Sequence, residues 1–569
     1  MISRSTSWQR RALLFALLGL PSVALAAAPA ASPPAAPVAA GVDPGRLDAQ
    51  VTAAYAPGDP GAAVLVAQGD QVLLRKGYGL ASVELGVPIE PDMVFRLGSI
   101  TKQFTAVAIL MLAEQGKLRL DQKVSETLPD YPKAQGEKVR IDHLLSHTSG
   151  IPSYTGIPEF WKHERKDLSA AEMFAFFAEL PLEFTPGERF EYSNSGYYVL
   201  GQIIEKVSGE SYADFVEKHI FTPAGMTASL YDNPLKRVPR RVAGHQMGED
   251  GIYAPAPYLS MSGPYAAGAL ASTVDDLRRW NEALLAGKLI SRASLEKAWT
   301  PYTLNDGKKS NYGFGWGIGQ YAGQRLISHN GGIHGFTTSM LLFPEKQLTI
   351  AVLSNGNELD PELVSQRLAM TLFGHQDEFK TIELPVETLA KFAGVYKISA
   401  TSRRVVRLEG GKLVTSRDGG RSFPASPISA TEFLYDGQND RFRFELDSAG
   451  KVTSMRMLRW GEAEPEVAER TDEKLPELPK FIEVEPAELD KLIGKYELQP
   501  GFVLAVRRQG AKLVTQATGQ GEIPLEAISA TEFAAPAVGA RLVFELEGGQ
   551  AKSLTLHQGG QVLPAKRID

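Results

Sequence analysis

The spacing of apolar residues predicts strands near the start of the chain and a buried helix soon after. Segments 62–67 and 71–76 are rich in apolar residues and flank a short polar turn that contains a glycine. This arrangement is typical of a β-hairpin. From 99 to 115 the apolar residues surround the helical wheel on all sides. Such a pattern predicts a buried helix, and Gly116 suits its C-terminal end.

The region that follows predicts helices and then strands again. We expect helices at 170–180, 197–207 and 273–285, joined by loops rich in Pro and Gly, and strands at 312–318, 325–328, 337–343 and 347–353. The middle pair of strands is expected to be joined by a turn at 329–332. Strands at both ends with helices between them predict an α+β fold. One antiparallel sheet would combine the N-terminal hairpin with the C-terminal strands, flanked by helices and an all-helical region.

The C-terminal part of the chain repeats itself at an offset of 100 residues. Gly394 and Tyr396 recur as Gly494 and Tyr496, and the six residues from Ile428 recur unchanged from position 528. Each copy consists of short alternating segments separated by Gly-rich turns. This pattern predicts two small antiparallel β-barrels of a lipocalin-like kind.

The first residues predict an exported protein. Basic residues precede a short apolar run, which ends in a small-x-small sequence at 24–26. This is the pattern of a secretory signal peptide over 1–26, and an Ala/Pro-rich spacer follows at 27–40. A membrane anchor is the alternative, but the run is short for a bilayer. We therefore expect a periplasmic or secreted protein. Arg10 and Arg11 leave open whether export is by the general or the twin-arginine route.

Length, charge and composition narrow the choice further. With 569 residues the chain has room for three domains, at 41–378, 384–468 and 486–569. It contains no cysteine, which excludes disulfides, thiolate metal sites and a cysteine nucleophile. The net charge is −6, and removal of the signal peptide with its three arginines makes it −9. This acidic balance argues against a nucleic-acid partner.

The start of the buried helix carries candidate catalytic residues. Ser99 and Lys102 are three positions apart and so share one helix face. A serine becomes a good nucleophile when a neighbour takes its proton, and a lysine whose pKa is lowered by burial is able to do so. The helix N-terminus also offers backbone N–H groups to a developing oxyanion. Alone, this pair is also typical of ordinary surface helices.

Two further motifs strengthen that interpretation. Tyr192 and Asn194 lie in a turn before the helix expected at 197. A tyrosine beside a lysine can be partly ionised and relay protons, and an asparagine can hold a substrate amide. His329 and Gly331 then mark the expected third turn, where glycine allows a close approach of substrate. Taken singly, these residues are equally typical of a core ring, a helix cap and an ordinary turn.

In this order the motifs resemble those of the penicillin-recognising serine hydrolases, which include class C β-lactamases, DD-carboxypeptidases, D-aminopeptidases and esterases. The resemblance covers about residues 43–375. It implies a serine β-lactamase/DD-peptidase-like fold and a role for each candidate. Ser99 would be the nucleophile, Lys102 its base and Tyr192 the proton carrier, with Asn194, His329, Gly331 and Gly332 binding substrate. The N–H groups of Ser99 and Gly332 would form the oxyanion hole.

The third motif departs from that of the β-lactamases, which usually carry Lys where this chain has His329. A histidine is mostly neutral near pH 7 and gives a carboxylate little to bind. His-x-Gly followed by two barrels is similar to the three-domain D-aminopeptidases, in which a barrel loop limits substrate size. We therefore expect an acyl-enzyme hydrolase of small amides, peptides or esters, most similar to a D-aminopeptidase. A carboxylesterase, a β-lactamase or DD-carboxypeptidase, and a silent binding protein for peptidoglycan peptides are the alternatives.

Other site chemistries fit the sequence less well. His143 and His147 have the spacing of zinc-binding helices, but Leu144 stands where the zinc-protease pattern needs Glu. A complete Gly-x-Ser-x-Gly elbow is not found. We expect no metal or other cofactor, no nucleic acid and no membrane span once the signal peptide is removed. The partner would be a small molecule or a short peptide, including one from peptidoglycan. Tyr154 and Trp316 are expected to line the pocket, and the sequence leaves the oligomeric state open.

Overall fold

A computed structural model describes most of the chain. It covers residues 42–233, 235–248, 250–375, 380–462, 464–499, 502–518, 521–558 and 561–569. The expected signal peptide at 1–26 and spacer at 27–40 lie outside these ranges. Within them, none of the helices combines the length and the apolar character that crossing a membrane requires.

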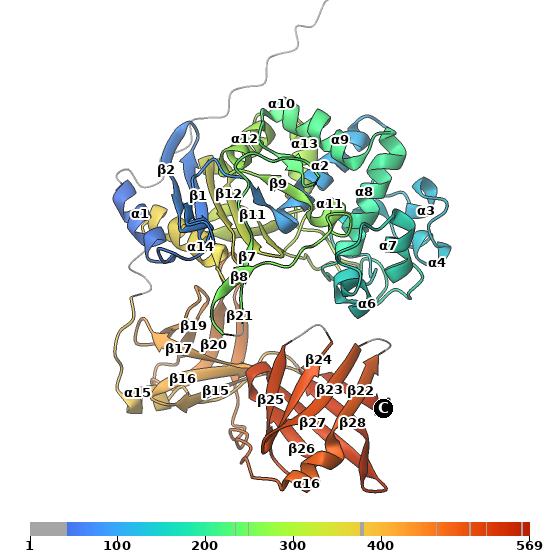
Figure 1. Cartoon of the computed structure of the whole chain (residues 1–569). Helices are drawn as coiled ribbons and strands as arrows, with labels where there is room; N and C mark the ends of the chain where they lie inside the picture. Colours follow the sequence, from blue (N-terminus) through green and yellow to red (C-terminus); the bar gives the residue numbers. More distant parts are fainter. Residues whose placement is uncertain are drawn as a thin grey trace, which may run out of the picture. The chain divides into compact units, whose positions relative to one another are not determined.

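The first part of the fold is built on a six-stranded antiparallel sheet in the order β10-β11-β12-β13-β1-β2 (Figure 1). Its strands are β1 (Ala62–Gln68), β2 (Gln71–Tyr78), β10 (Gly317–Tyr321), β11 (Gln324–Ile333), β12 (Phe336–Phe343) and β13 (Leu348–Ser354). Strand β1 pairs with β2 on one side and with β13 on the other. The predicted sheet that joins the N-terminal hairpin to the C-terminal strands is therefore confirmed.

Helices cover both faces of this sheet. Successive side chains of a strand point to opposite faces. Accordingly, Val64 packs in a cluster with residues of α1 (Pro44–Thr52) and α14 (Pro361–Leu372). Leu65 belongs to the larger core with α2 (Thr101–Glu114) and α12 (Val274–Leu285). Strand β1 is thus buried on both faces.

An all-helical region and several short strands complete this part. Its helices are α3 (Val124–Thr127), α4 (Lys133–Gly136), α5 (Ile141–Leu145), α6 (Pro158–Trp161), α7 (Ala170–Phe177), α8 (Asn194–Ser208), α9 (Tyr212–Val216), α10 (Thr222–Ala224), α11 (Tyr265–Gly268) and α13 (Arg292–Ala298). Its short strands are β3 (Leu80–Ser82), β4 (Val87–Pro88), β5 (Phe95–Arg96), β6 (Leu230–Tyr231), β7 (His245–Met247), β8 (Tyr253–Pro255) and β9 (Leu270–Ser272). Helices α7, α8 and α12 correspond to the three predicted for this region.

Two local predictions are wrong. Residues 329–332 do not form a turn, because they lie within β11 and pair with 337–340 of β12. The glycine there serves close packing: a side chain on Gly331 would meet the carbonyl oxygen of Leu97 at 2.0 Å. The predicted strand at 312–318 is mostly loop, since β10 begins only at Gly317. Gly315 has a φ of +88°, which is outside the strand region.

The repeated segments form two closed eight-stranded barrels, as predicted. The first comprises β14 (Gly394–Lys397), β15 (Arg403–Glu409), β16 (Lys412–Arg417), β17 (Ser422–Pro427), β18 (Glu432–Tyr435), β19 (Arg441–Leu446), β20 (Val452–Leu458) and β21 (Glu466–Arg470). The second comprises β22 (Gly494–Gln499), β23 (Phe502–Gln509), β24 (Lys512–Ala517), β25 (Glu522–Ala527), β26 (Glu532–Ala535), β27 (Ala540–Glu547), β28 (Gln550–Gln558) and β29 (Gln561–Arg567). A short helix precedes each barrel, α15 (Val386–Ala390) and α16 (Pro486–Leu489).

The two barrels share detail as well as topology. The hydroxyl of Tyr396 donates to the carbonyl of Phe392 at 2.7 Å, and that of Tyr496 donates to Leu492 at the same distance. Each tyrosine lies opposite an arginine at the closure of its barrel, where the first strand pairs with the last. The repeat seen in the sequence is therefore a repeat of one packed unit.

Candidate active site

Ser99 and Lys102 lie at the junction of a 3₁₀ turn and helix α2. The turn spans Gly98–Ile100, and Gly98 has a φ of +54°. The Lys102 side chain is fully buried. Its Nζ lies 3.0 Å from Ser99 Oγ, 2.8 Å from Asn194 Oδ1 and 2.8 Å from the carbonyl oxygen of Ala267. Nucleophile and base candidates thus meet as the sequence predicts.

These distances suit a neutral amine. Burial holds the pKa of Lys102 well below its ordinary value. A neutral amine has two N–H donors and one lone pair. Asn194 Oδ1 and the Ala267 carbonyl only accept hydrogen bonds, so they use both donors. The lone pair is then available to the hydroxyl proton of Ser99, which is the arrangement that a general base requires.

Tyr192 completes this cluster from the loop before α8. Lys102 Nζ lies 4.8 Å from the centre of the Tyr192 ring. The side chain exposes 36% of its surface, yet loss of solvation raises the pKa of Tyr192 far above its ordinary value, and a hydrogen bond with Ser99 only partly opposes this. The raised pKa therefore favours a protonated Tyr192 hydroxyl, able to donate its proton, over the partly ionised one that the sequence suggested.

Asn194 is the first residue of α8, and its side chain faces the cluster instead of capping the helix. Ser193 is the N-cap, since its Oγ accepts from the backbone N–H of Gly196 at 3.4 Å. The Asn194 amide nitrogen donates to Thr155 Oγ1 at 3.2 Å. Its oxygen accepts from Lys102, so both ends of the amide are fixed.

His329 of β11 is buried and neutral. Its Nδ1 lies 2.6 Å from the carbonyl oxygen of Asn330, and its Nε2 lies 2.8 Å from the hydroxyl of Tyr312. A carbonyl only accepts, so Nδ1 carries the hydrogen and Nε2 accepts from the tyrosine. Burial, followed by the charge of Lys102, lowers the pKa of His329 to about 3. The third motif therefore supplies no positive charge at neutral pH.

Glycines bring β11 against the nucleophile. A side chain on Gly98 would meet the backbone nitrogen of Gly332 at 2.9 Å, and one on Gly331 would meet Thr338 Oγ1 at 2.2 Å. Gly332 itself faces open space and lines the cavity next to Ser99. Gly98 and Gly331 therefore leave no room for a side chain, whereas Gly332 has room for a small one.

The cavity beside Ser99 measures about 90 Å³ and has an aromatic wall. Its larger side chains are those of Tyr154, Phe160, Trp161, Leu259, Ile333 and His334. The rings of Trp161 and His334 stack at 5.8 Å. Tyr154 is thus at the cavity as expected. Trp316 is not among its lining residues: it is buried and packs edge-on against Trp299 at 6.2 Å.

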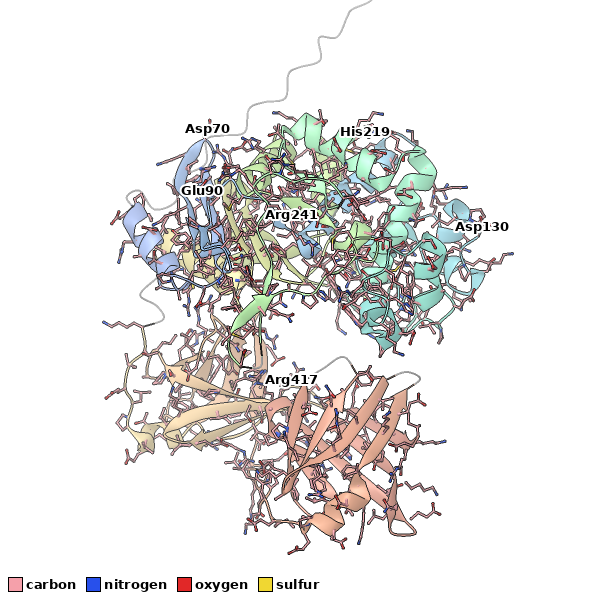
Figure 2. The ribbon with its side chains drawn as sticks, viewed as in Figure 1. Asp70, Glu90, Asp130, His219, Arg241 and Arg417 are labelled. Atoms are coloured by element: carbon pink, nitrogen blue, oxygen red, sulfur yellow. The ribbon has the colours of Figure 1, made fainter. Side chains whose placement is uncertain are left out.

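A buried ion-pair cluster holds the strand that leads into Ser99. Asp232, of whose side chain 1% is exposed, accepts from Arg96 Nε in β5 at 2.8 Å and from Arg241. Figure 2 labels Arg241. Removal of one partner of such a cluster leaves a buried charge unpaired. Arg96 therefore has a structural role close to the nucleophile.

Sequence reasoning missed several site residues. Tyr312 is hydrogen-bonded to His329 and lies in a run that alternates aromatic residues with glycine. This unusual composition could have marked it as a site residue. Trp161 carried no such signal, and the carbonyl of Ala267 is invisible in any sequence pattern. His143 and His147 each accept a backbone N–H at Nδ1, from Arg140 and Ser193. In the described ranges, no three acidic, His or Cys side chains are grouped as a metal ion would require.

Comparison with known proteins agrees with this geometry. The sequence matches the Beta-lactamase family over residues 14–374. It is 30% identical to penicillin-binding protein 4* of Bacillus subtilis over 438 residues, which cover 72% of this chain and 94% of the relative. It is also 31% identical to the putative penicillin-binding protein PbpX of the same species over 52% of this chain and 71% of that protein.

Solved structures give the same result. The octameric penicillin-binding protein homologue from Pyrococcus abyssi superposes with a TM-score of 0.55 at 28% identity, covering 75% of this chain and all of that one. A D-stereospecific amidohydrolase from a Streptomyces species superposes with a TM-score of 0.50 at 27% identity, covering 58% and 98%. The fold, the match over more than half of the sequence and these relatives agree, and the chain belongs to the Beta-lactamase family of serine hydrolases.

Proposed function

We propose that the protein is an exported serine hydrolase that cleaves small amides, short peptides or esters through an acyl-enzyme. Ser99 is the nucleophile, Lys102 the general base and Tyr192 the proton donor to the leaving group. The observation that carries the proposal is the buried Lys102 amine, 3.0 Å from Ser99 Oγ with both of its N–H donors occupied elsewhere.

In the acylation step, Ser99 Oγ attacks the substrate carbonyl carbon while its proton passes to Lys102 Nζ. The backbone N–H groups of Ser99 and Gly332 stabilise the oxyanion that forms. As the carbon–nitrogen or carbon–oxygen bond breaks, Tyr192 gives its proton to the leaving group and regains one from Lys102. Water then attacks the ester on Ser99 in the same way and releases the acid.

The substrate is proposed to present a neutral group to the third motif. A β-lactam or a C-terminal D-alanine carries a carboxylate that needs a cation, and the buried His329 remains uncharged. Among the described residues that line the cavity, none is Lys or Arg. The similarity to a D-stereospecific amidohydrolase supports a D-residue beside the scissile bond. The favoured substrate class is therefore a D-aminoacyl amide or peptide, with esters second.

An active-site labelling experiment tests the nucleophile. A fluorescent phosphonate, which reacts with serine nucleophiles and needs no carboxylate site, should attach to the wild-type protein and not to Ser99→Ala. Ser294→Ala removes a half-buried hydroxyl in α13, which is not among the residues lining the cavity, and should label like the wild type. Labelling that survives in Ser99→Ala would overturn the proposal.

A substrate panel tests the order of preference. Turnover is measured on D-alanine p-nitroanilide, a p-nitrophenyl ester, nitrocefin and a D-alanyl-D-alanine peptide. We expect the D-aminoacyl amide to give the highest kcat/KM, followed by the ester. Efficient nitrocefin turnover without turnover of the amide would overturn the substrate class while leaving the nucleophile untouched.

A further inference from the structure

His147 is buried in an unfavourable backbone conformation beside Tyr192, the proposed proton donor. It lies two residues beyond the end of α5, exposes 1% of its surface and has a φ of +57°. This left-handed region is uncommon for residues other than glycine, although Asn, Asp and His enter it more readily than most. A strained, buried polar residue persists where its surroundings require it.

Three contacts of His147 converge on Tyr192. The backbone N–H of Glu191 donates to the His147 carbonyl at 2.8 Å, and the backbone N–H of Ser193 donates to His147 Nδ1 at 3.1 Å. The His147 ring lies 4.1 Å from the Tyr192 ring, between centroids. Both neighbours of Tyr192 are therefore held by one residue, which also packs on the tyrosine itself.

The hydrogen bond to Ser193 fixes the state of the imidazole. Nδ1 accepts, so the ring hydrogen is on Nε2. In the described part of the chain Nε2 has no hydrogen-bond partner, and the rings of Tyr197 and Tyr312 lie 5.0 and 4.9 Å away. Burial, followed by the charges of Lys102 and His329, holds the pKa of His147 well below its ordinary value. Leaving a buried donor unpaired destabilises the fold, so packing stability alone does not explain this histidine.

We propose that His147 is a positioning residue, which holds the backbone on both sides of Tyr192 so that the tyrosine hydroxyl stays at the leaving group during acyl transfer. This inference rests on the proposed role of Tyr192. His147 itself is not a catalytic residue, because its hydrogen bonds and ring contacts among the described residues do not include Ser99. The prediction is that activity depends on an acceptor at the Nδ1 position.

Two amide variants separate positioning from bulk packing. In His147→Asn the side-chain oxygen is at the distance of Nδ1 and can still accept from Ser193, and asparagine tolerates the left-handed backbone. In His147→Gln the amide reaches one atom further, so the Nδ1 acceptor is lost. Hydrolysis of D-alanine p-nitroanilide by His147→Gln should show kcat lowered about 100-fold with KM nearly unchanged, the effect of a misplacement of about 1 Å. His147→Asn should stay within about fivefold of the wild type.

The leaving group provides a readout that a merely structural role would not change. A p-nitrophenyl ester releases a stable phenolate and needs little proton donation, so its turnover should fall less than about fivefold in His147→Gln. In a Tyr192→Phe background, His147→Gln should lower kcat on the amide less than about threefold, because the effects of two residues that act through one another do not add. Circular dichroism and Tm show whether each full-length variant is folded.

The outcomes are distinct. Equal amide turnover by folded Asn and Gln variants, or a full Gln effect that persists in Tyr192→Phe, overturns the positioning role. If His147→Gln does not fold, His147→Asn decides the question. An amide-to-ester turnover ratio equal to that of the wild type supports the positioning role, and a strongly lowered ratio overturns it. Loss of the proposed function would be seen separately, as probe labelling of Ser99→Ala.

Discussion

The active-site cleft and the first barrel both bury a basic side chain, but only the one in the barrel has a carboxylate partner. Lys102 Nζ contacts a hydroxyl, an amide oxygen and a carbonyl, and its hydrogen-bond partners among the described residues include no carboxylate. Arg404 in the barrel donates to Glu466 at 3.0 Å and to the hydroxyl of Tyr435 at 3.3 Å. An amine buried without a counter-ion has a lowered pKa, whereas a buried guanidinium needs a partner for its permanent charge.

The second barrel shows the same position without charges. Strand registers align Arg404 with Leu504, because these residues lie opposite Tyr396 and Tyr496. Tyr435 corresponds to Ala535 by the offset of 100 residues, and Glu466 corresponds to Leu563 by its place in the last strand. The fold forms with either set, so the pair in the first barrel is not required by the topology. For Lys102, the proposed role as general base supplies the reason for burying an amine without a counter-ion.

The largest expected effect concerns Lys102. Lys102→Met keeps the length of the side chain and removes the base, so kcat should fall by about 10⁴-fold, as when a member of a catalytic triad is removed. The unfolding free energy should change by less than about 2 kcal/mol, because lost hydrogen bonds and removed desolvation oppose each other. Steady-state kinetics and urea unfolding test both. Retained activity in Lys102→Met would show that the buried amine is not the base, and the contrast with the structural Arg404 would no longer hold.

Arg404→Leu should give the opposite result, a loss of stability with no change at Ser99. It leaves the partly buried Glu466 with only Arg417 and Arg459 nearby, which should lower the unfolding free energy by about 3 kcal/mol. Adding Glu466→Leu copies the second barrel and should restore most of this. Chemical unfolding measures both variants, and probe labelling of Ser99 checks that the active site is unchanged. A lower unfolding free energy for the double variant than for Arg404→Leu would refute the interpretation.

Gly331 and Gly332 form a matched pair within the cleft. Gly331→Ala pushes β11 away from Leu97 and the nucleophile that follows it, and kcat/KM should fall about 100-fold, as expected for a misplacement near 1 Å. Gly332→Ala faces open space and should keep probe labelling within about threefold. Equal effects of the two substitutions would contradict the packing argument.

The pH dependence should reflect the lowered pKa of Lys102. kcat/KM should rise with pH until the Lys102 amine is neutral, and below the pKa of Lys102 it should fall about tenfold per pH unit.

Stability should also depend on pH through Lys102. Between its lowered pKa in the folded protein and the ordinary value of 10.5, the unfolded chain binds a proton that the folded chain does not. Stability therefore rises with pH in this window, and Lys102→Met should remove that slope. An inflection near pH 6.5 that disappears in His329→Gln would contradict a neutral His329.

Glu466 provides the acidic counterpart. Burial alone would raise the pKa of Glu466, but the hydrogen bond and charge of Arg404, with Arg417 and Arg459, leave it below its ordinary value of 4.5. Its contribution to stability is complete above that value and is lost as the pH falls through the lowered pKa. In the Arg404→Leu/Glu466→Leu variant this acid-side slope should be smaller.

The smallest expected effect is at Thr515. Its Oγ1 is buried without a hydrogen-bond partner in the described residues, whereas Thr415 Oγ1 lies 2.6 Å from the Tyr435 hydroxyl. Thr515→Val should raise the unfolding free energy by about 1 kcal/mol, and Thr415→Val should lower it by about 1 kcal/mol. Thermal unfolding of both variants measures the difference, and shifts of the same sign would argue against it.

The sequence was sufficient for the features that repeat or carry a motif. Alternating apolar positions predicted the hairpin and the joint sheet, and the 100-residue offset predicted two barrels. The spacing of Ser99 and Lys102 predicted one shared helix face. Each of these depends on local periodicity, which single sequences record directly.

Features set by contacts between distant segments could not be predicted in the same way. The glycines around Gly331 looked like a turn because nothing in the sequence reveals that Leu97 packs against them. His147 stood out in the sequence only for its spacing from His143. Its hydrogen bonds on both sides of Tyr192 form because residues 46 positions apart meet in the fold. The replacement of Arg404 by Leu504 was visible in the repeat, but its partners in the last strand were not.

The repeat also bears on how the gene can change. The residues from Ile428 are identical to those from 528, and both copies make the same turn, in which Ile428 and Ile528 donate to Glu432 and Glu532. Recombination between these copies would fuse the first half of one barrel to the second half of the other in perfect register. The fused barrel would keep Arg404 and lose Glu466 and Tyr435 together, leaving a buried charge unanswered. Such a fused barrel should therefore be less stable than either of the two barrels, because the partners of Arg404 lie in the half that is exchanged.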